Sequence, residues 1–292
     1  MVIRGTAMDR YIDEYDMLKK SSETFRQAMD KLNMAVMTDP RIIDDSGVPR
    51  FVLTKLTNHK RAITVRDSIL YRAESILHHT ALLIREYNNK LSYFNEMQFN
   101  ERLAPQIRHE FAQNLQLTTT FYSEDVIVNI ITLFDYIANF FGYWKYGEHK
   151  LKIKWKGLMS CARNSEYEKK NMNTTVLAVS ELGSVLQAHH NEYWKILEDY
   201  RGDIVHNHMH GPSSRVSINI MEGHVDVKIF APKGRIGQLA KLSGCNETEE
   251  MDYIEAIVML ANNGFVRLFD IVNQMHNLHD YNAPFPRVRI MR

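Results

Sequence analysis

The chain is short of cysteine, of proline and of any excess of one charge. Its 292 residues include 2 Cys and 7 Pro, and 36 Lys and Arg nearly balance 35 Asp and Glu, for a net charge of +1. Two cysteines exclude a disulfide framework and a four-cysteine zinc site. The balanced charge, together with 45% apolar residues, excludes a disordered chain. Near neutrality also argues against a protein that binds nucleic acid through a broad basic surface.

No segment has the character of a membrane span or a secretory signal. The most apolar stretch, 126–144, contains Asn129, Asp135 and Asn139, whereas a spanning helix needs about 20 mostly apolar residues. The first residues, MVIRG, lack the charged and apolar regions of a signal peptide. We therefore expect a cytoplasmic protein without membrane contact, in which both cysteines are reduced.

Apolar residues recur at helical spacing through most of the chain. The pattern predicts helices over 8–36, 62–94, 105–115, 123–147, 173–200, 203–210 and 248–276. Ser123 and Thr248, each followed by two acidic residues, are expected to cap their helices. Between 216 and 229 the apolar spacing changes to two around Glu222-Gly223, which predicts a β-hairpin. The sequence thus predicts an all-α fold with a small inserted β-hairpin, divided into an N-terminal helical region, 1–118, and a helical domain, 119–292.

Histidine is concentrated in one part of the chain, since five of the 13 His lie between residues 189 and 210. The segment 200–207 in this part reads YRGDIVHN. Gly202 is predicted to break the preceding helix, and Asp203 to cap a short new helix whose free N–H groups face Arg201. A guanidinium beside a helix N-terminus is suited to bind a phosphate. His206, one turn along, is suited to move protons near pH 7.

This segment resembles the signature of the HEPN family (higher eukaryotes and prokaryotes nucleotide-binding domains), in which four to six residues separate an Arg from a His. The resemblance implies a HEPN-like helical bundle over roughly residues 120–280, and a homodimer that brings two Arg-His motifs into one cleft. It implies a metal-independent endoribonuclease that acts as a toxin or antiviral (abortive-infection) effector, with an antitoxin or another defence protein as a partner. In that setting residues 1–118 would regulate the domain or extend the dimer.

The resemblance assigns catalysis to Arg201 and His206. It leaves supporting roles to their neighbours Tyr200, Asp203, Asn207 and His208. His206 would accept the proton of a ribose 2′-OH, which attacks the adjacent phosphate, and Arg201 would stabilise the charge that develops there. No metal or other cofactor is needed, because the nucleophile belongs to the RNA. His208 also satisfies the spacing, but four intervening residues is the commoner form and favours His206.

Other interpretations of these residues stay open. The spacing alone is not specific, because other pairs satisfy it: Arg72 with His78 or His79, and Arg102 with His109. A silent HEPN-like module that binds RNA or protein is the first alternative, and some members of the family are of this kind. A His-cluster metal hydrolase is the second, because alternating His206, His208 and His210 could ligate zinc. The adjacent His189 and His190 are expected at a surface or between helices.

Five positions on one helix turn through about 140°. Arg201 and His206 therefore reach one phosphate only if Gly202 breaks the helix or a second copy supplies one of the two side chains.

Lysines alternate with other residues just before position 157. The segment 150–156 reads KLKIKWK, so that Lys150, Lys152, Lys154 and Lys156 accompany Trp155. Cations that bind phosphates, beside aromatic rings that stack on bases, are typical of RNA binding. The alternative is a solvated edge with a buried aromatic residue. The sequence therefore predicts an RNA contact here, and positive charge that is local rather than general.

Overall fold

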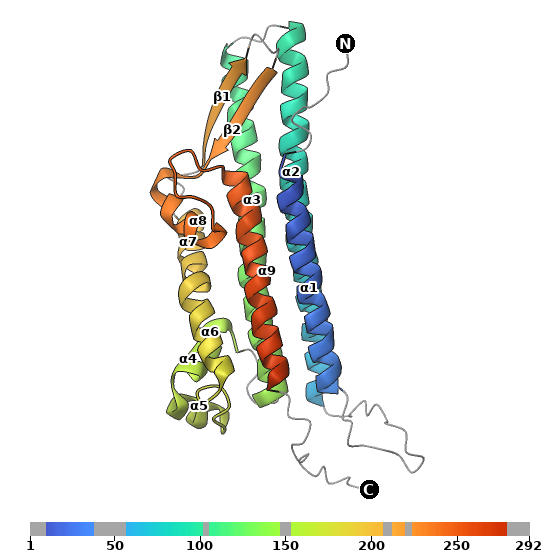
Figure 1. Ribbon diagram of the computed structural model, residues 1–292, viewed down its shortest axis with the longest axis vertical. Helices are drawn as coiled ribbons and strands as arrows, with labels where there is room; N and C mark the ends of the chain where they lie inside the picture. Colours follow the sequence, from blue (N-terminus) through green and yellow to red (C-terminus); the bar gives the residue numbers. More distant parts are fainter. Residues whose placement is uncertain are drawn as a thin grey trace, which may run out of the picture.

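The computed structural model describes residues 10–37, 57–101, 105–146, 153–206, 212–219 and 224–278. The long helices run side by side along its long axis (Figure 1): α1 (Ile12–Met37), α2 (Thr57–Glu101), α3 (Pro105–Phe141) and α9 (Tyr253–Asn277). Shorter helices form a layer on one side: α4 (Trp155–Arg163), α5 (Ser165–Met172), α6 (Glu181–His189), α7 (Lys195–His206) and α8 (Ile236–Ser243). Strands β1 (Ser213–Asn219) and β2 (His224–Phe230) form the one sheet of the described residues. The predicted all-α class with a small β-hairpin is confirmed.

The long helices share one hydrophobic core. The rings of Phe25 on α1 and Phe265 on α9 lie 5.7 Å apart, and Phe94 of α2 stacks on Phe111 of α3 at 4.2 Å. The predicted boundary between residues 118 and 119 falls inside α3. Helix α1, from before that boundary, packs on α9, from after it. The two predicted regions are therefore parts of one packed unit in this structure.

Helix α3 passes through Ser123 without interruption, so the helix start predicted there is wrong. Ser123 is fully buried, and its hydroxyl donates to the Thr119 carbonyl at 2.7 Å. A serine that bonds back to the preceding turn continues a helix instead of capping a new one. Within the described residues, Gln106–Lys145 is long and apolar enough to cross a membrane, but 61% of its most apolar stretch is buried inside the protein. That burial is the pattern of a core helix.

The hairpin lies against the neighbouring ends of α2 and α3 (Figure 1). Its antiparallel register places Ser213 opposite Phe230, and the turn predicted at Glu222-Gly223 lies outside the described residues. The Tyr87 hydroxyl of α2 donates to the Val227 carbonyl at 2.6 Å. A backbone group of β2 is thus bonded to a long helix, which fixes the hairpin on the bundle.

A polar network fixes the turn before α1 to the hairpin and to the start of α9. Arg10 forms an ion pair with Asp226 of β2 at 2.8 Å, and the Tyr11 hydroxyl donates to Asp252 at 2.7 Å. Asp252 also caps α9, because its carboxylate accepts two N–H groups of the first turn. The cap predicted at Thr248 is therefore wrong. Burial raises the pKa of Asp252 above its ordinary value.

A buried carboxylate organises the segment between α5 and α6. Glu168 of α5 is fully buried and accepts the backbone N–H groups of three consecutive residues, 176–178, at 2.8–3.0 Å. The helix predicted over 173–200 is accordingly shorter and begins at Glu181, with Ser180 as its cap. It then widens into a π-helical turn, η4 (His190–Trp194), which leads into α7.

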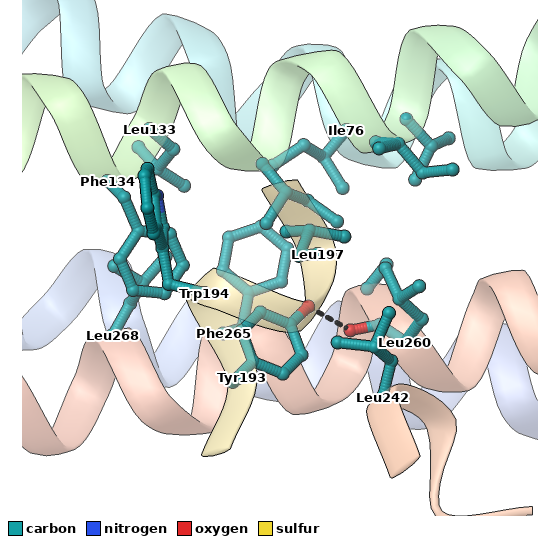
Figure 2. Close-up of a cluster of buried hydrophobic side chains, with 14 of the residues drawn as sticks. Ile76, Leu133, Phe134, Tyr193, Trp194, Leu197, Leu242, Leu260, Phe265 and Leu268 are labelled. Carbon is teal, nitrogen blue, oxygen red and sulfur yellow. Dashed lines mark hydrogen bonds between the residues drawn. The ribbon is translucent and has the colours of Figure 1, made fainter. Parts of the chain in front are cut away.

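Aromatic and aliphatic side chains from both layers meet at the centre of the molecule (Figure 2). Tyr193 and Trp194 of η4 reach the same cluster as Phe134 of α3 and Leu268 of α9. The Tyr193 hydroxyl donates to the Leu260 carbonyl of α9 at 2.7 Å. The side layer, which carries most of the candidate functional residues, is thus anchored to the long helices at η4.

Candidate functional site

Helix α7 carries the Arg-His motif and continues without a break through Gly202. Among the described residues, no atom outside the helix's own backbone and the adjacent residues lies within 4 Å of the position that a Cβ at Gly202 would take. The predicted helix break is therefore wrong, and Asp203 caps no new helix. Arg201 lies near the C-terminal end of a helix, where the carbonyl groups disfavour an anion. The phosphate site predicted from backbone N–H groups is thus not formed by this segment.

Arg201 is exposed, and no residue in the described ranges pairs with its guanidinium. The preceding side chain has the opposite environment. Tyr200 is fully buried, its hydroxyl faces that of Tyr253 on α9, and the Tyr253 hydroxyl in turn faces that of Ser123 on α3. Burial raises the pKa of Tyr200 well above its ordinary value. The supporting role expected of Tyr200 at a substrate is therefore wrong, because this side chain anchors α7 in the core.

Asp203 forms an ion pair with Arg235 at 2.6 Å. Arg235 belongs to the short 3₁₀ turn η5 (Lys233–Arg235), which precedes α8. The pair ties the end of α7 to this turn. Asp203 therefore positions the helix that carries Arg201, through a contact that the sequence pattern does not reveal.

His206 is the last residue of α7, and its side chain lies outside the described part of the chain, as do Asn207 and His208. The backbone of α7 is nevertheless helical from Arg201 to His206. Five residues of α-helix turn the side-chain direction by about 140°. Because the helix break is not formed, the second copy is the one remaining predicted way for Arg201 and His206 to share a phosphate, and it stays a prediction.

A different Arg-His pair is brought together within one chain. Arg72 and His79 are seven residues apart on α2 and so lie on one face of the helix. The Arg72 guanidinium donates to the side-chain oxygen of Asn129 on α3 at 2.7 Å, and the Asn129 amide nitrogen lies 3.3 Å from Nδ1 of His79. Asn129 is only 4% exposed. The bridge satisfies a buried amide and joins α2 to α3.

Trp155 is fully buried, so its predicted role as a base-stacking platform is wrong. Its ring packs edge-on against Phe134, with centroids 4.8 Å apart, and its indole Nε1 donates to Nδ1 of His190 at 3.2 Å. Lys154 and Lys156 on either side of it are exposed, and Lys156 pairs with Glu198 of α7 at 2.8 Å. Lys150 and Lys152 lie outside the described residues. Lys154 and Lys156 are thus exposed, as an RNA contact requires, but Trp155 does not present its ring to a base.

His189 and His190 point to different partners. His189 lies 2.7 Å from the Asp270 carboxylate of α9 and also contacts Arg267, which donates to Glu192 at 3.1 Å. These contacts fasten α6 and η4 to α9. These contacts join residues about 80 positions apart, and only the two adjacent histidines signalled them in the sequence.

His190 is buried between Trp155 and Trp194, and its ring stacks on the latter with centroids 5.2 Å apart. Burial lowers the pKa of His190, and the nearby charge of Arg163 lowers it further. The ring is thus held neutral near pH 7. Since Nδ1 accepts the indole hydrogen, Nε2 carries the proton of the neutral ring.

Within the described ranges, no group of three or more His, Cys, Asp or Glu side chains is placed to hold a metal ion. His208 and His210 lie outside these ranges, so a zinc site there stays a prediction. No protein-family model matches the sequence, and no curated protein or solved structure matches it with significance. The resemblance to the HEPN family therefore rests on the motif at residues 200–207.

Proposed function

We propose that this protein is a metal-independent endoribonuclease of HEPN type, in which Arg201 of one copy and His206 of a second copy act on the same phosphate of RNA. The observation that carries the proposal is the motif YRGDIVHN on a firmly held helix. Tyr200 in the core and Asp203 in its ion pair fix α7, while Arg201 stays exposed. A guanidinium held in this way is suited to bind a phosphate. Following the resemblance, we place the protein in the cytoplasm as a toxin or antiviral effector with an antitoxin or defence partner.

The chemistry needs a base and a cation at one phosphodiester. His206 accepts the proton of the ribose 2′-OH, whose oxygen attacks the adjacent phosphorus. The bond to the 5′-oxygen breaks, that oxygen takes up a proton, and the products carry a cyclic phosphate and a 5′-OH. Arg201 stabilises the negative charge that develops on the phosphate oxygens. DNA lacks the 2′-OH and is spared.

Cleavage of single-stranded RNA in excess EDTA tests this proposal. We expect the wild-type protein to release fragments with cyclic phosphate ends, and both Arg201→Ala and His206→Ala to abolish them. Arg85→Ala is the matched control, because Arg85 is an exposed arginine of α2 that pairs with Glu86. Unchanged cleavage in both motif variants would overturn the proposal.

A second candidate is a catalytically silent module that binds RNA or protein. The unbroken α7 favours it, because the helix break that was expected to bring Arg201 and His206 of one chain to one phosphate is not formed. This candidate predicts binding without cleavage, and no growth arrest when the protein is expressed. Growth arrest that depends on Arg201 would exclude it.

A further inference from the structure

Most of the described arginines have their charge cancelled by a carboxylate. Ion pairs with Asp or Glu are formed by Arg10, Arg26, Arg66, Arg85, Arg215, Arg235 and Arg267. Arg163, at the end of α4, differs from them. It donates to the neutral side-chain amide of Asn191 at 3.3 Å and is exposed. Its positive charge is therefore held in place and remains free to attract an anion.

Two more cations gather around the same point. Lys156 of α4 forms an ion pair with Glu198 of α7 at 2.8 Å, and Lys195 follows Asn191, the partner of Arg163, by four residues along the same helical segment. The charges of Arg163, Lys195 and Lys156 also lower the pKa of His190, and that of Glu198 raises it. Lys156 and Lys195 are exposed, and the Lys156 ammonium also lies 5.7 Å from the centre of the Trp194 ring. We call Lys156, Arg163 and Lys195 the basic patch. With Glu198 included, its formal charge is about +2, on a chain whose total is +1.

The floor of the basic patch is rigid. His190 is fixed by the hydrogen bond from Trp155 and by stacking on Trp194. Both tryptophans are almost fully buried, and the Trp194 indole nitrogen has no hydrogen-bond partner within the described residues. The π-helical turn η4 supplies His190 and Asn191 to this floor, and such turns occur frequently at functional sites. Cations on a rigid base bind an anion with little loss of conformational entropy.

We propose that Lys156, Arg163 and Lys195, beside His190, form a phosphate-binding site that holds the backbone of single-stranded RNA and leads it to Arg201. This proposal rests on the proposed function and names where its substrate binds. Lys195, Glu198 and Arg201 follow one another at three-residue spacing on α7. Six residues turn the side-chain direction by about 120°, so an RNA strand that contacts both Lys195 and Arg201 curves around the helix. Six residues of helix place Lys195 and Arg201 about 9 Å apart along the axis.

Binding without cleavage tests the site. The probe is a fluorescent single-stranded RNA with 2′-O-methyl riboses, which cannot attack the phosphate, and anisotropy is measured over a range of salt concentrations. Each phosphate contact contributes about 0.7 to the salt slope of log K for a single strand. We expect Arg163→Gln with Lys195→Gln to weaken binding and to reduce this slope by about 1.4. Lys20→Gln, an exposed lysine on α1 outside the layer that carries the patch, should leave both unchanged.

An unchanged affinity and slope in the double variant would overturn the proposal, as would the absence of any binding by the wild-type protein. Because the 2′-O-methyl RNA is not cleaved, its binding is measured independently of the cleavage that tests the proposed function. Binding that depends on the basic patch supports the site even if natural RNA is never cut. Conversely, cleavage that depends on Arg201 together with patch-independent binding supports the proposed function and removes this site.

The pKa of His190, followed by NMR of its ring, identifies the ligand. A phosphate group bound among Arg163, Lys195 and Lys156 adds negative charge near the ring, so the pKa should rise when the 2′-O-methyl RNA is added. Inorganic phosphate at the same phosphate concentration should leave it unchanged, and the Arg163→Gln, Lys195→Gln variant should show no rise with RNA. An equal rise with inorganic phosphate would contradict an RNA site.

Discussion

Tyr193 and Gly264 are neighbours in the core, and a double-mutant cycle on them tests the packing that supports the side layer. The Tyr193 hydroxyl donates to the Leu260 carbonyl at 2.7 Å (Figure 2) and lies 2.9 Å from the place that a Cβ at position 264 would occupy. Oxygen and carbon do not approach so closely without displacement. The hydrogen bond restrains the hydroxyl from moving away.

The contacts give the magnitude of each substitution. Tyr193→Phe removes one hydrogen bond and should lower the free energy of unfolding by about 1 kcal/mol. Gly264→Ala gains about 1 kcal/mol of helix propensity, but overpacking against the Tyr193 hydroxyl costs about 1–3 kcal/mol. In the Tyr193→Phe background the nearest atom to the new Cβ is Ile130 Cγ2 at 3.4 Å. There the overpacking disappears and the gain from propensity remains.

We therefore expect the double variant to be more stable than the sum of the two single effects by about 1–3 kcal/mol. Urea unfolding of the four proteins, followed by far-UV circular dichroism, measures this coupling, and equal m-values confirm that the same transition is compared. Additivity within about 0.5 kcal/mol would refute the contact between Tyr193 and Gly264.

Four further predictions concern the side layer. Glu168→Gln should lower the free energy of unfolding by roughly 3 kcal/mol in urea, because one amide group cannot replace a carboxylate that accepts three N–H groups; the exposed Glu166→Gln should have no measurable effect. Gly183→Ala places a Cβ 2.1 Å from a carbonyl oxygen and should cost about 3 kcal/mol. Gly202→Ala meets no atom within 4 Å and should instead stabilise α7 by about 0.5–1 kcal/mol, and a loss would contradict an unbroken helix. The pKa of His190 in the folded protein is below its ordinary value of 6.5. The contribution of the neutral ring to stability is therefore complete above about pH 6.5 and is lost as the pH falls through the folded pKa. His190→Gln should make the fall of Tm below pH 6.5 shallower, and an equally steep fall would contradict the buried neutral ring.

The sequence predicts the fold class and the hairpin well, because long helical periodicity and a change to a period of two are strong local signals. It predicts helix boundaries less well. Ser123 and Gly202 each have the local chemistry of a helix boundary, yet α3 and α7 continue through them. At Ser123 the burial of the surrounding face outweighs that local chemistry. The sequence pattern predicts no helix over 155–172, although α4 and α5 lie there. Those helices are short, and their apolar faces carry few repeats of the pattern.

The candidate site is predictable only in part, for a related reason. The motif residues and the local positive charge are visible in the sequence, but their environments depend on distant contacts. The sequence does not show whether Trp155 stacks on a base or lies in the core. Its burial against Phe134 decides between the two. The position of Arg163 beside η4 and of Lys156 beside α7 likewise depends on contacts across the fold, to Asn191 and Glu198.

A mixture of two inactive variants tests whether the active site is shared between two copies of the chain. If each active site takes Arg201 from one copy and His206 from another, a heterodimer of Arg201→Ala and His206→Ala retains one intact site of two. Random exchange makes half of the dimers heterodimers, so the mixture should recover about a quarter of wild-type RNA cleavage in EDTA, while each variant alone stays inactive. A mixture that exchanges subunits and remains inactive, beside an active wild-type protein, would contradict the shared site.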